Sequence, residues 1–199
     1  MSPTIPLERH LTAWACQNAW ANHRLLQACA RLSPGEFAAP RTGFFPSLKA
    51  TLNHIVTVDW MYADAMERAM AGREPHPDIG SFYEPEAPFD SVATLAPAQK
   101  AVDLRFVALC ESLGAADLAR PVALLRRKGR VEEQMHRLLA HVFEHQIHHR
   151  GQAHAMLSGT SVAPPQLDEF FCANEADLRA AEFAELGFSE TAIWAQPKA

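Results

Sequence analysis

The sequence predicts an all-α protein: a four-helix bundle in one domain over residues 1–199, with a short helical appendage near its C-terminal end. Apolar residues recur at three- and four-residue spacings along four long segments, the period of a helix with one buried face. Clusters of proline and glycine separate these segments. A length of 199 residues favours one domain with a sizeable core.

The first two long helices are predicted from their apolar period and their end signals. One runs from Pro6 to about Leu32 and stops at a Ser-Pro-Gly sequence. The next begins after Ser47, whose hydroxyl can cap a helix, and runs to Met70, shortly before Gly72. The stretch that follows, residues 73–90, is rich in proline and predicts an ordered surface crossing.

A third helix is predicted from a cap at Asp90 or Ser91 to about Leu113, before a glycine. The apolar run 121–125 and the short segment 129–131 come next. Their composition predicts a small hairpin or an extended loop.

The fourth long helix is predicted from about Glu132 to Leu157, where Ser-Gly ends it. The Pro164-Pro165 pair marks a turn. A mostly helical tail is predicted over 167–185. Short loops and one long crossing between four such helices are typical of a bundle.

The charge balance disfavours nucleic acid as a partner. The formal net charge is −5 and the sequence pI is near 6.0. Binding to nucleic-acid phosphates usually requires a basic stripe. The densest basic run is Arg126-Arg127-Lys128, with Arg130 nearby, and we interpret it as a solvated loop.

Cysteine usage and the terminal sequence predict a cytoplasmic protein. No two cysteines form a CxxC pair, which favours reduced, mostly buried thiols. Residues Met1 to Pro6 lack a basic region followed by an apolar run, so we expect no signal peptide, and no apolar stretch predicts a membrane span. The cysteines are Cys16, Cys29, Cys110 and Cys172.

Histidines are the most informative residues, and ten are present. His141, His145 and His149 follow one another at four-residue spacing on the fourth predicted helix, so they lie within an arc of ~80°. His148 and Gln152 fall in nearly the same sector. Imidazoles on successive turns can share one metal ion. The chain has no HExxH motif, so a zinc-peptidase mechanism does not follow.

A third ligand has to come from another helix, and His54 is the best candidate. It lies among apolar residues of the second helix, where an unpartnered imidazole is costly to bury. Three histidines with one open position are a catalytic type of metal site, and imidazole suits Zn, Ni, Cu or Fe. A histidine that is only hydrogen-bonded in the core or at the surface is the alternative, and spacing alone accepts either His145 or His148.

The segment His141-Val-Phe-Glu-His145-Gln-Ile-His148-His149-Arg-Gly-Gln resembles the signature of the DinB family of metalloenzyme-like proteins. Leu52-Asn53-His54-Ile55, Trp20-Ala21-Asn22 and the later Pro-Pro-Gln-Leu-Asp turn resemble it as well. The resemblance implies an up-down-down-up bundle, often a homodimer. It also implies one divalent transition metal, zinc or nickel before others, bound by His54, His145 and His149. His23 departs from the family pattern.

Roles for other residues are expected in outline. Asp59 lies about 140° from His54 on a straight helix, so we do not expect it to bind the ion; it can help position the site or face solvent, and we favour solvent. Gln152 and Asn53 are candidates to fix histidine tautomers. Arg150 is expected in a surface salt bridge, with an anionic substrate group as its alternative partner.

His141 is a candidate to line the pocket or carry protons. His148 is expected at the helix surface or an interface. The tryptophans Trp14, Trp20 and Trp60 are expected in the core.

Three functions compete. The first is a metal-dependent enzyme acting on a small molecule. The resemblance extends to enzymes that use low-molecular-weight thiols, a mycothiol-dependent isomerase and bacillithiol S-transferases, and so suggests thiol transfer or isomerisation. The second is a non-catalytic metal-holding or stress-related protein, in which a fourth protein ligand closes the site. Nucleic-acid binding ranks third.

Overall fold

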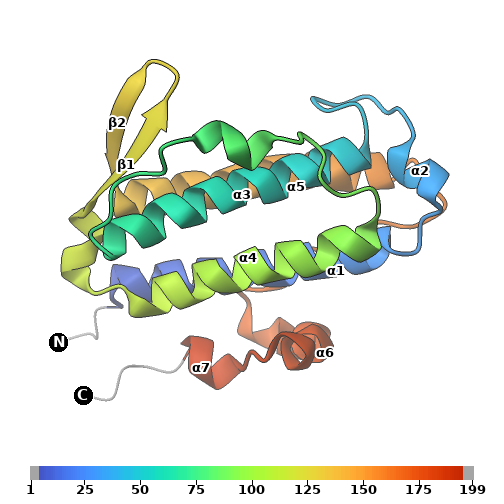
Figure 1. The fold of residues 1–199 in the computed structure, drawn as a ribbon. Helices are drawn as coiled ribbons and strands as arrows, with labels where there is room; N and C mark the ends of the chain where they lie inside the picture. The colour runs from blue at the N-terminus through green and yellow to red at the C-terminus, as the bar shows by residue number, and fades with distance from the viewer. Residues whose placement is uncertain (1–4, 195–199) are drawn as a thin grey trace.

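The computed structural model describes residues 5–194 and is mostly helical, with four long helices lying side by side (Figure 1). α1 packs against α4 and α3 against α5, and the pairs meet through α3 with α4 and α1 with α5. The expectations for Met1–Thr4 and for the last residues of the 1–199 domain lie outside the described residues. The long helices are α1 (Leu7–Cys29), α3 (Leu48–Met70), α4 (Val92–Ser112) and α5 (Met135–Leu157).

Shorter elements complete the fold. α6 and α7 pack on the outer side of α1, and a β-hairpin projects from one end of the long helices (Figure 1). This hairpin is the only sheet in the described part of the chain, so the all-α prediction holds for everything else in that part. The short elements are α2 (Pro34–Ala38), η1 (Ile79–Tyr83), η2 (Ala115–Ala119), β1 (Pro121–Arg126), β2 (Gly129–Gln134), η3 (Ala173–Glu175), α6 (Ala176–Leu186) and α7 (Glu190–Trp194).

Two of the predicted helix starts are confirmed by their caps. The Ser47 hydroxyl accepts a hydrogen bond from the Ala50 N–H at 3.1 Å, and Ser91, rather than Asp90, caps α4. Gly72, just after α3, has φ +63°. That conformation is costly for residues with a side chain, so glycine ends the helix here.

Two predicted boundaries are wrong. Residues 132–134 belong to β2 and pair with residues 121–123 of β1, so α5 begins at Met135. The tail is helical only from Ala176, because the stretch before it is irregular, with a turn at residues 169–170 and the short 3-10 helix η3. At residues 132–134, backbone pairing with the neighbouring strand competes with helix formation, and helical periodicity alone does not reveal that competition.

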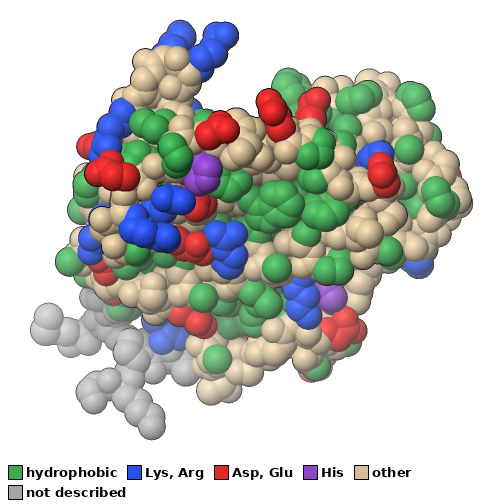
Figure 2. All heavy atoms as spheres, in the orientation of Figure 1, with side chains coloured by type: hydrophobic (Ala, Val, Ile, Leu, Met, Phe, Trp, Pro, Cys, Tyr) green, Lys and Arg blue, Asp and Glu red, His purple; other side chains and the backbone are tan. Residues whose placement is uncertain are grey.

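The predicted basic loop is the tip of the hairpin, where Figure 2 shows Lys and Arg side chains at its end. Arg126 turns back and donates a hydrogen bond to the Tyr62 hydroxyl at 3.0 Å. Arg130 pairs with Glu132 at 2.8 Å and with Glu74 at 3.2 Å. Part of the basic charge is therefore offset by acidic neighbours.

The core between the long helices is apolar along most of its length. Trp20 and Phe106 are fully buried, whereas Trp14 and Trp60 are half-buried against the core. Cys16, Cys29 and Cys110 are buried free thiols, as predicted, and Cys172 is exposed. No described helix combines the length and apolarity that a bilayer crossing requires.

Candidate metal centre

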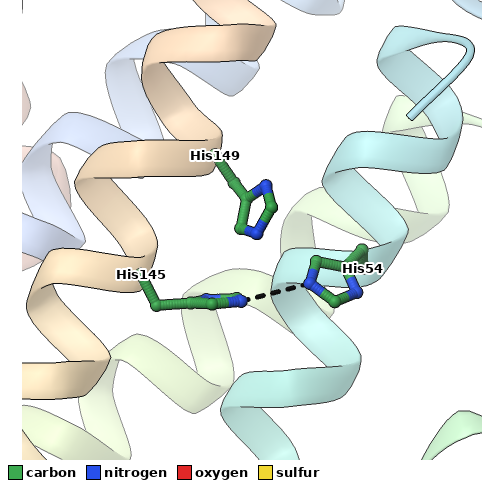
Figure 3. A group of neighbouring side chains, drawn as sticks. All are labelled: His54, His145 and His149. Carbon is green, nitrogen blue, oxygen red and sulfur yellow. Dashed lines mark hydrogen bonds between the residues drawn. The ribbon is translucent and has the colours of Figure 1, made fainter. Parts of the chain in front are cut away.

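Three histidines from two neighbouring helices converge on one point. His54 projects from α3, and His145 and His149 project from successive turns of α5, which packs against α3 (Figure 3). One donor atom from each imidazole lies within 4.8 Å of the others, and the Nε2 atoms of His54 and His145 are 3.1 Å apart. The structure therefore brings together the three residues that the sequence singled out.

The surroundings keep these imidazoles neutral. Burial, reinforced by His149, lowers the pKa of His54 to about 4. Burial and the neighbouring histidines, His149 first, lower the pKa of His145 to about 3, and burial also lowers the pKa of His149. A metal ligand has to offer an unprotonated nitrogen. All three side chains are thus in the ligand form at neutral pH.

Gln152 fixes the orientation and tautomer of His149. Its Oε1 atom can only accept, so His149 donates Nδ1–H to it at 3.1 Å and keeps the Nε2 lone pair free. The same amide donates to the Nε2 atom of the exposed His148 at 2.9 Å. This support of a histidine by a second residue, predicted for Gln152, is common around metal ligands.

Asn53 does not have the predicted role. Its amide hydrogen-bonds the carbonyl oxygens of Lys49 and Phe89 and accepts from the Phe89 N–H at 2.8 Å, with no bond to His54. Asn53 instead ties α3 to the crossing that precedes α4. A backbone partner 36 residues away cannot be found from helical spacing.

Aromatic side chains cover the group, and the sequence interpretation missed them. Phe45 lies with its ring centroid 4.4 Å from that of His54 and 5.5 Å from that of His149. The adjacent Phe44 is 77% exposed, 6.2 Å from His149. Both belong to the stretch between α2 and α3. The Phe-Phe pair preceding the cap of α3 was the available signal.

His141, on the same stripe of α5, stays outside the donor group. It is exposed, its ring lies 6.3 Å from His145, and it contacts Tyr62 edge-on at 5.4 Å. Its place beside the group is compatible with the predicted pocket-lining role. His148 is exposed, as predicted, and touches the group only through Gln152.

Behind the histidines lies a buried network that contradicts two predictions. Asp59 is fully buried and accepts hydrogen bonds from Gln99 and Gln146 rather than facing solvent. Arg150 is 3% exposed, and its Nη1 atom donates to Asn18 and Asn22 instead of forming a surface salt bridge.

Amide side chains separate opposite charges in this network. Asn18 and Asn22 accept from Arg150 through oxygen and donate to Asp103 through nitrogen, at 3.0–3.1 Å for Asp103 Oδ1. Burial raises the pKa of Asp103 to about 7 and that of Asp59 well above its usual range. This network positions α5, and with it both histidines of that helix, against α1, α3 and α4.

The donor set fits a divalent transition metal ion. Two neutral imidazoles that direct Nε2 atoms at each other across 3.1 Å repel if both carry lone pairs, and a shared cation relieves that repulsion. Asp59, on α3, does not belong to the donor group. Within the described residues the group has three members, all of them histidines.

The fold and this site define a mostly helical protein with a three-histidine group that could hold a metal ion. Residues 8–182 match the DinB family, and the chain belongs to that family. None of the curated proteins compared with the chain matches it.

Proposed function

We propose that His54, His145 and His149 bind one divalent transition metal ion, with zinc and nickel as the first candidates. The observation that carries this proposal is the convergence of three imidazole donors within 4.8 Å, all of them neutral at physiological pH. Membership of the DinB family supports the same ligand set.

The site fits an enzyme better than a structural ion. A structural zinc site usually has four protein ligands, and in the described part of the chain no other His, Cys, Asp or Glu joins the group. An ion held by three histidines supplies Lewis-acid chemistry: it polarises a carbonyl group or lowers the pKa of a thiol. The non-catalytic metal-holding role remains the second candidate, and it requires a fourth ligand.

The chain's own residues have defined tasks in this proposal. Gln152 holds the His149 tautomer, and Phe45 shields one side of the imidazoles from water. Phe44 offers an exposed apolar surface beside His149 for the body of a small substrate. The proposed reaction is transfer of a low-molecular-weight thiol to a small electrophile, or thiol-assisted isomerisation, as in related thiol-dependent enzymes.

Elemental analysis tests the metal. Protein purified without a metal-affinity column should contain close to one equivalent of a transition metal, and His145→Ala prepared in parallel should contain little. The loaded protein is then screened with several thiols and electrophiles. Metal bound without turnover, together with a fourth protein ligand by X-ray absorption, would favour the metal-holding role. Absence of metal and of affinity for added zinc and nickel would refute both.

The arrangement of the helices, the assembly and the cellular location are further proposals. We propose an up-down-down-up bundle, supported by the contacts of each long helix with two others, and a homodimer formed through helix faces, supported by the family. A cytoplasmic location is supported by the free cysteines. Small molecules, rather than nucleic acid, are the proposed ligands.

A further inference from the structure

A cavity lies on a different face of α5 from the three-histidine group. It has a volume of about 450 Å³, and neither His145 nor His149 lines it. It is open to solvent on one side, and α1, α5 and the segment 166–171 form its mainly apolar walls. These walls include Trp14, Ile147, Leu167 and Phe171.

Arg150 presents an unused hydrogen-bonding edge here. Its Nη1 atom makes all the side-chain hydrogen bonds found for it in the described residues, to Asn18, Asn22 and Gln146. Its Nε and Nη2 atoms make no hydrogen bond to the described residues. Neither atom is fully buried. These two atoms therefore keep some accessible surface although the residue is only 3% exposed, and Arg150 lines this cavity.

The free edge has the shape that binds a carboxylate. Nε–H and Nη2–H of a guanidinium are parallel, so they match the two oxygens of one carboxylate. The same chain uses this pairing elsewhere: Arg105 binds Glu67 and Arg179 binds Glu190 through Nε and Nη2, at 2.7–2.9 Å. At Arg150 no carboxylate of residues 5–194 makes the corresponding pair.

Gln17 adds a second polar group to the wall of the cavity. It is only 7% exposed, it lines the cavity, and its Oε1 atom is buried without a hydrogen-bond partner. A buried acceptor left unsatisfied costs free energy, and rotation of this side chain toward the cavity would let a donor on a ligand satisfy it. An adjacent hydroxyl or amino group on the bound acid would supply that donor.

The surrounding charges tolerate one anion. Asp59 and Asp103 lie in the network behind Arg150, and burial raises the pKa of each, to about 7 for Asp103. Their negative charge at neutral pH is thereby reduced. Asp168 is exposed at the rim, where water screens it, and His154 uses Nε2 to bond the Pro165 carbonyl at 2.8 Å.

We propose that this cavity binds a small organic acid whose carboxylate pairs with the Nε–Nη2 edge of Arg150. A hydroxyl or amino group next to the carboxylate donates to Gln17, and an apolar body packs against Trp14, Ile147 and Phe171. The site is separate from the metal centre and does not depend on the function proposed for it.

Three related probes test the chemistry by calorimetry and ligand-observed NMR. 3-Phenyllactate should bind saturably, and its neutral amide should bind at least about tenfold more weakly, because it loses a charge-assisted pair. 3-Phenylpropionate, which lacks the hydroxyl, should bind severalfold more weakly than phenyllactate. In Gln17→Leu this last difference should disappear.

A matched pair at an exposed position avoids disturbing the buried network. Ile147 is 47% exposed and lines the cavity. Ile147→Glu places a carboxylate within ~8 Å of the bound one and should weaken binding roughly three- to fivefold relative to Ile147→Gln. Circular dichroism checks that both variants fold.

The outcomes separate this proposal from the metal function. Binding of phenyllactate that persists in His145→Ala supports a second site, whereas binding lost in that variant would assign the acid to the metal centre and overturn the proposal. The proposal also fails if phenyllactate shows no saturable binding up to about 10 mM, or if acid and amide bind equally.

Discussion

Replacing single residues of the candidate metal centre should weaken metal binding most for a proposed ligand. The loss should be smaller for a residue that hydrogen-bonds a ligand, and smallest for one that is neither a ligand nor hydrogen-bonded to one. His145→Ala removes one of three donors. Zinc sites with four protein ligands bind with about 10–16 kcal/mol, or roughly 2.5–4 kcal/mol per ligand. Loss of one ligand therefore corresponds to about a hundred- to thousandfold weaker binding.

Gln152 and His148 lie outside the proposed ligand set, and the expected losses are smaller. Gln152→Ala removes the acceptor that holds His149 Nδ1 at 3.1 Å, and losses of such supports cost about ten- to a hundredfold. His148→Ala removes only a 2.9 Å hydrogen bond from Gln152, so we expect an effect of about tenfold or less.

Apo-protein titrated with zinc and nickel against a chromophoric chelator gives these affinities, and far-UV circular dichroism checks helical content. Helical content should survive in all three variants, because apolar faces supply most of the stability of packed helices. Equal losses in His148→Ala and His145→Ala would refute the ligand assignment. Unfolding of His145→Ala would instead indicate a structural ion.

Three further predictions concern charge, packing and assembly. The raised pKa of Asp103 makes the folded state bind more protons, so this residue should lower the free energy of unfolding as pH rises from about 4 to 7, by at most ~1.4 kcal/mol per unit. The lowered pKa values of His54, His145 and His149 act in the opposite direction, so the Asp103 contribution is measured by urea denaturation as the difference in pH slope between the wild type and Asp103→Asn. Phe106→Ala should cost about 3–5 kcal/mol by the same assay, whereas a loss under ~1 kcal/mol would contradict its full burial. Sedimentation should show a dimer at micromolar concentrations, and a monomer throughout would count against it.

Helical spacing predicted the long helices and the shared face of His145 and His149, since both depend on residues within one or two turns, whereas the choice of His145 over His148 came from the family resemblance. His145 and His149 share a face of α5 whatever surrounds them, and His54 lies on the helix that packs against that face. The caps at Ser47 and Ser91 were predictable for the same local reason.

The buried network could not be predicted from the sequence, because its hydrogen-bond partners come from different helices. Asp59 does point away from His54, as its angle predicts, but that direction leads into the core, where Gln99 of α4 and Gln146 of α5 meet it. Arg150 meets Asn18 and Asn22 more than a hundred residues earlier in the chain. A single sequence offers no signal for pairs so distant.

The placement of His54 and His145 has a consequence for how long the protein survives. These residues are 91 positions apart and lie on separate helices, so an ion bound to both would cross-link distant parts of the chain. Ligand that binds only the folded state adds to its stability, by about 2.7 kcal/mol at a hundred times the dissociation constant. Resistance to heat and to proteases would then rise with free metal concentration, and cellular abundance of the protein would follow metal supply independently of its turnover rate.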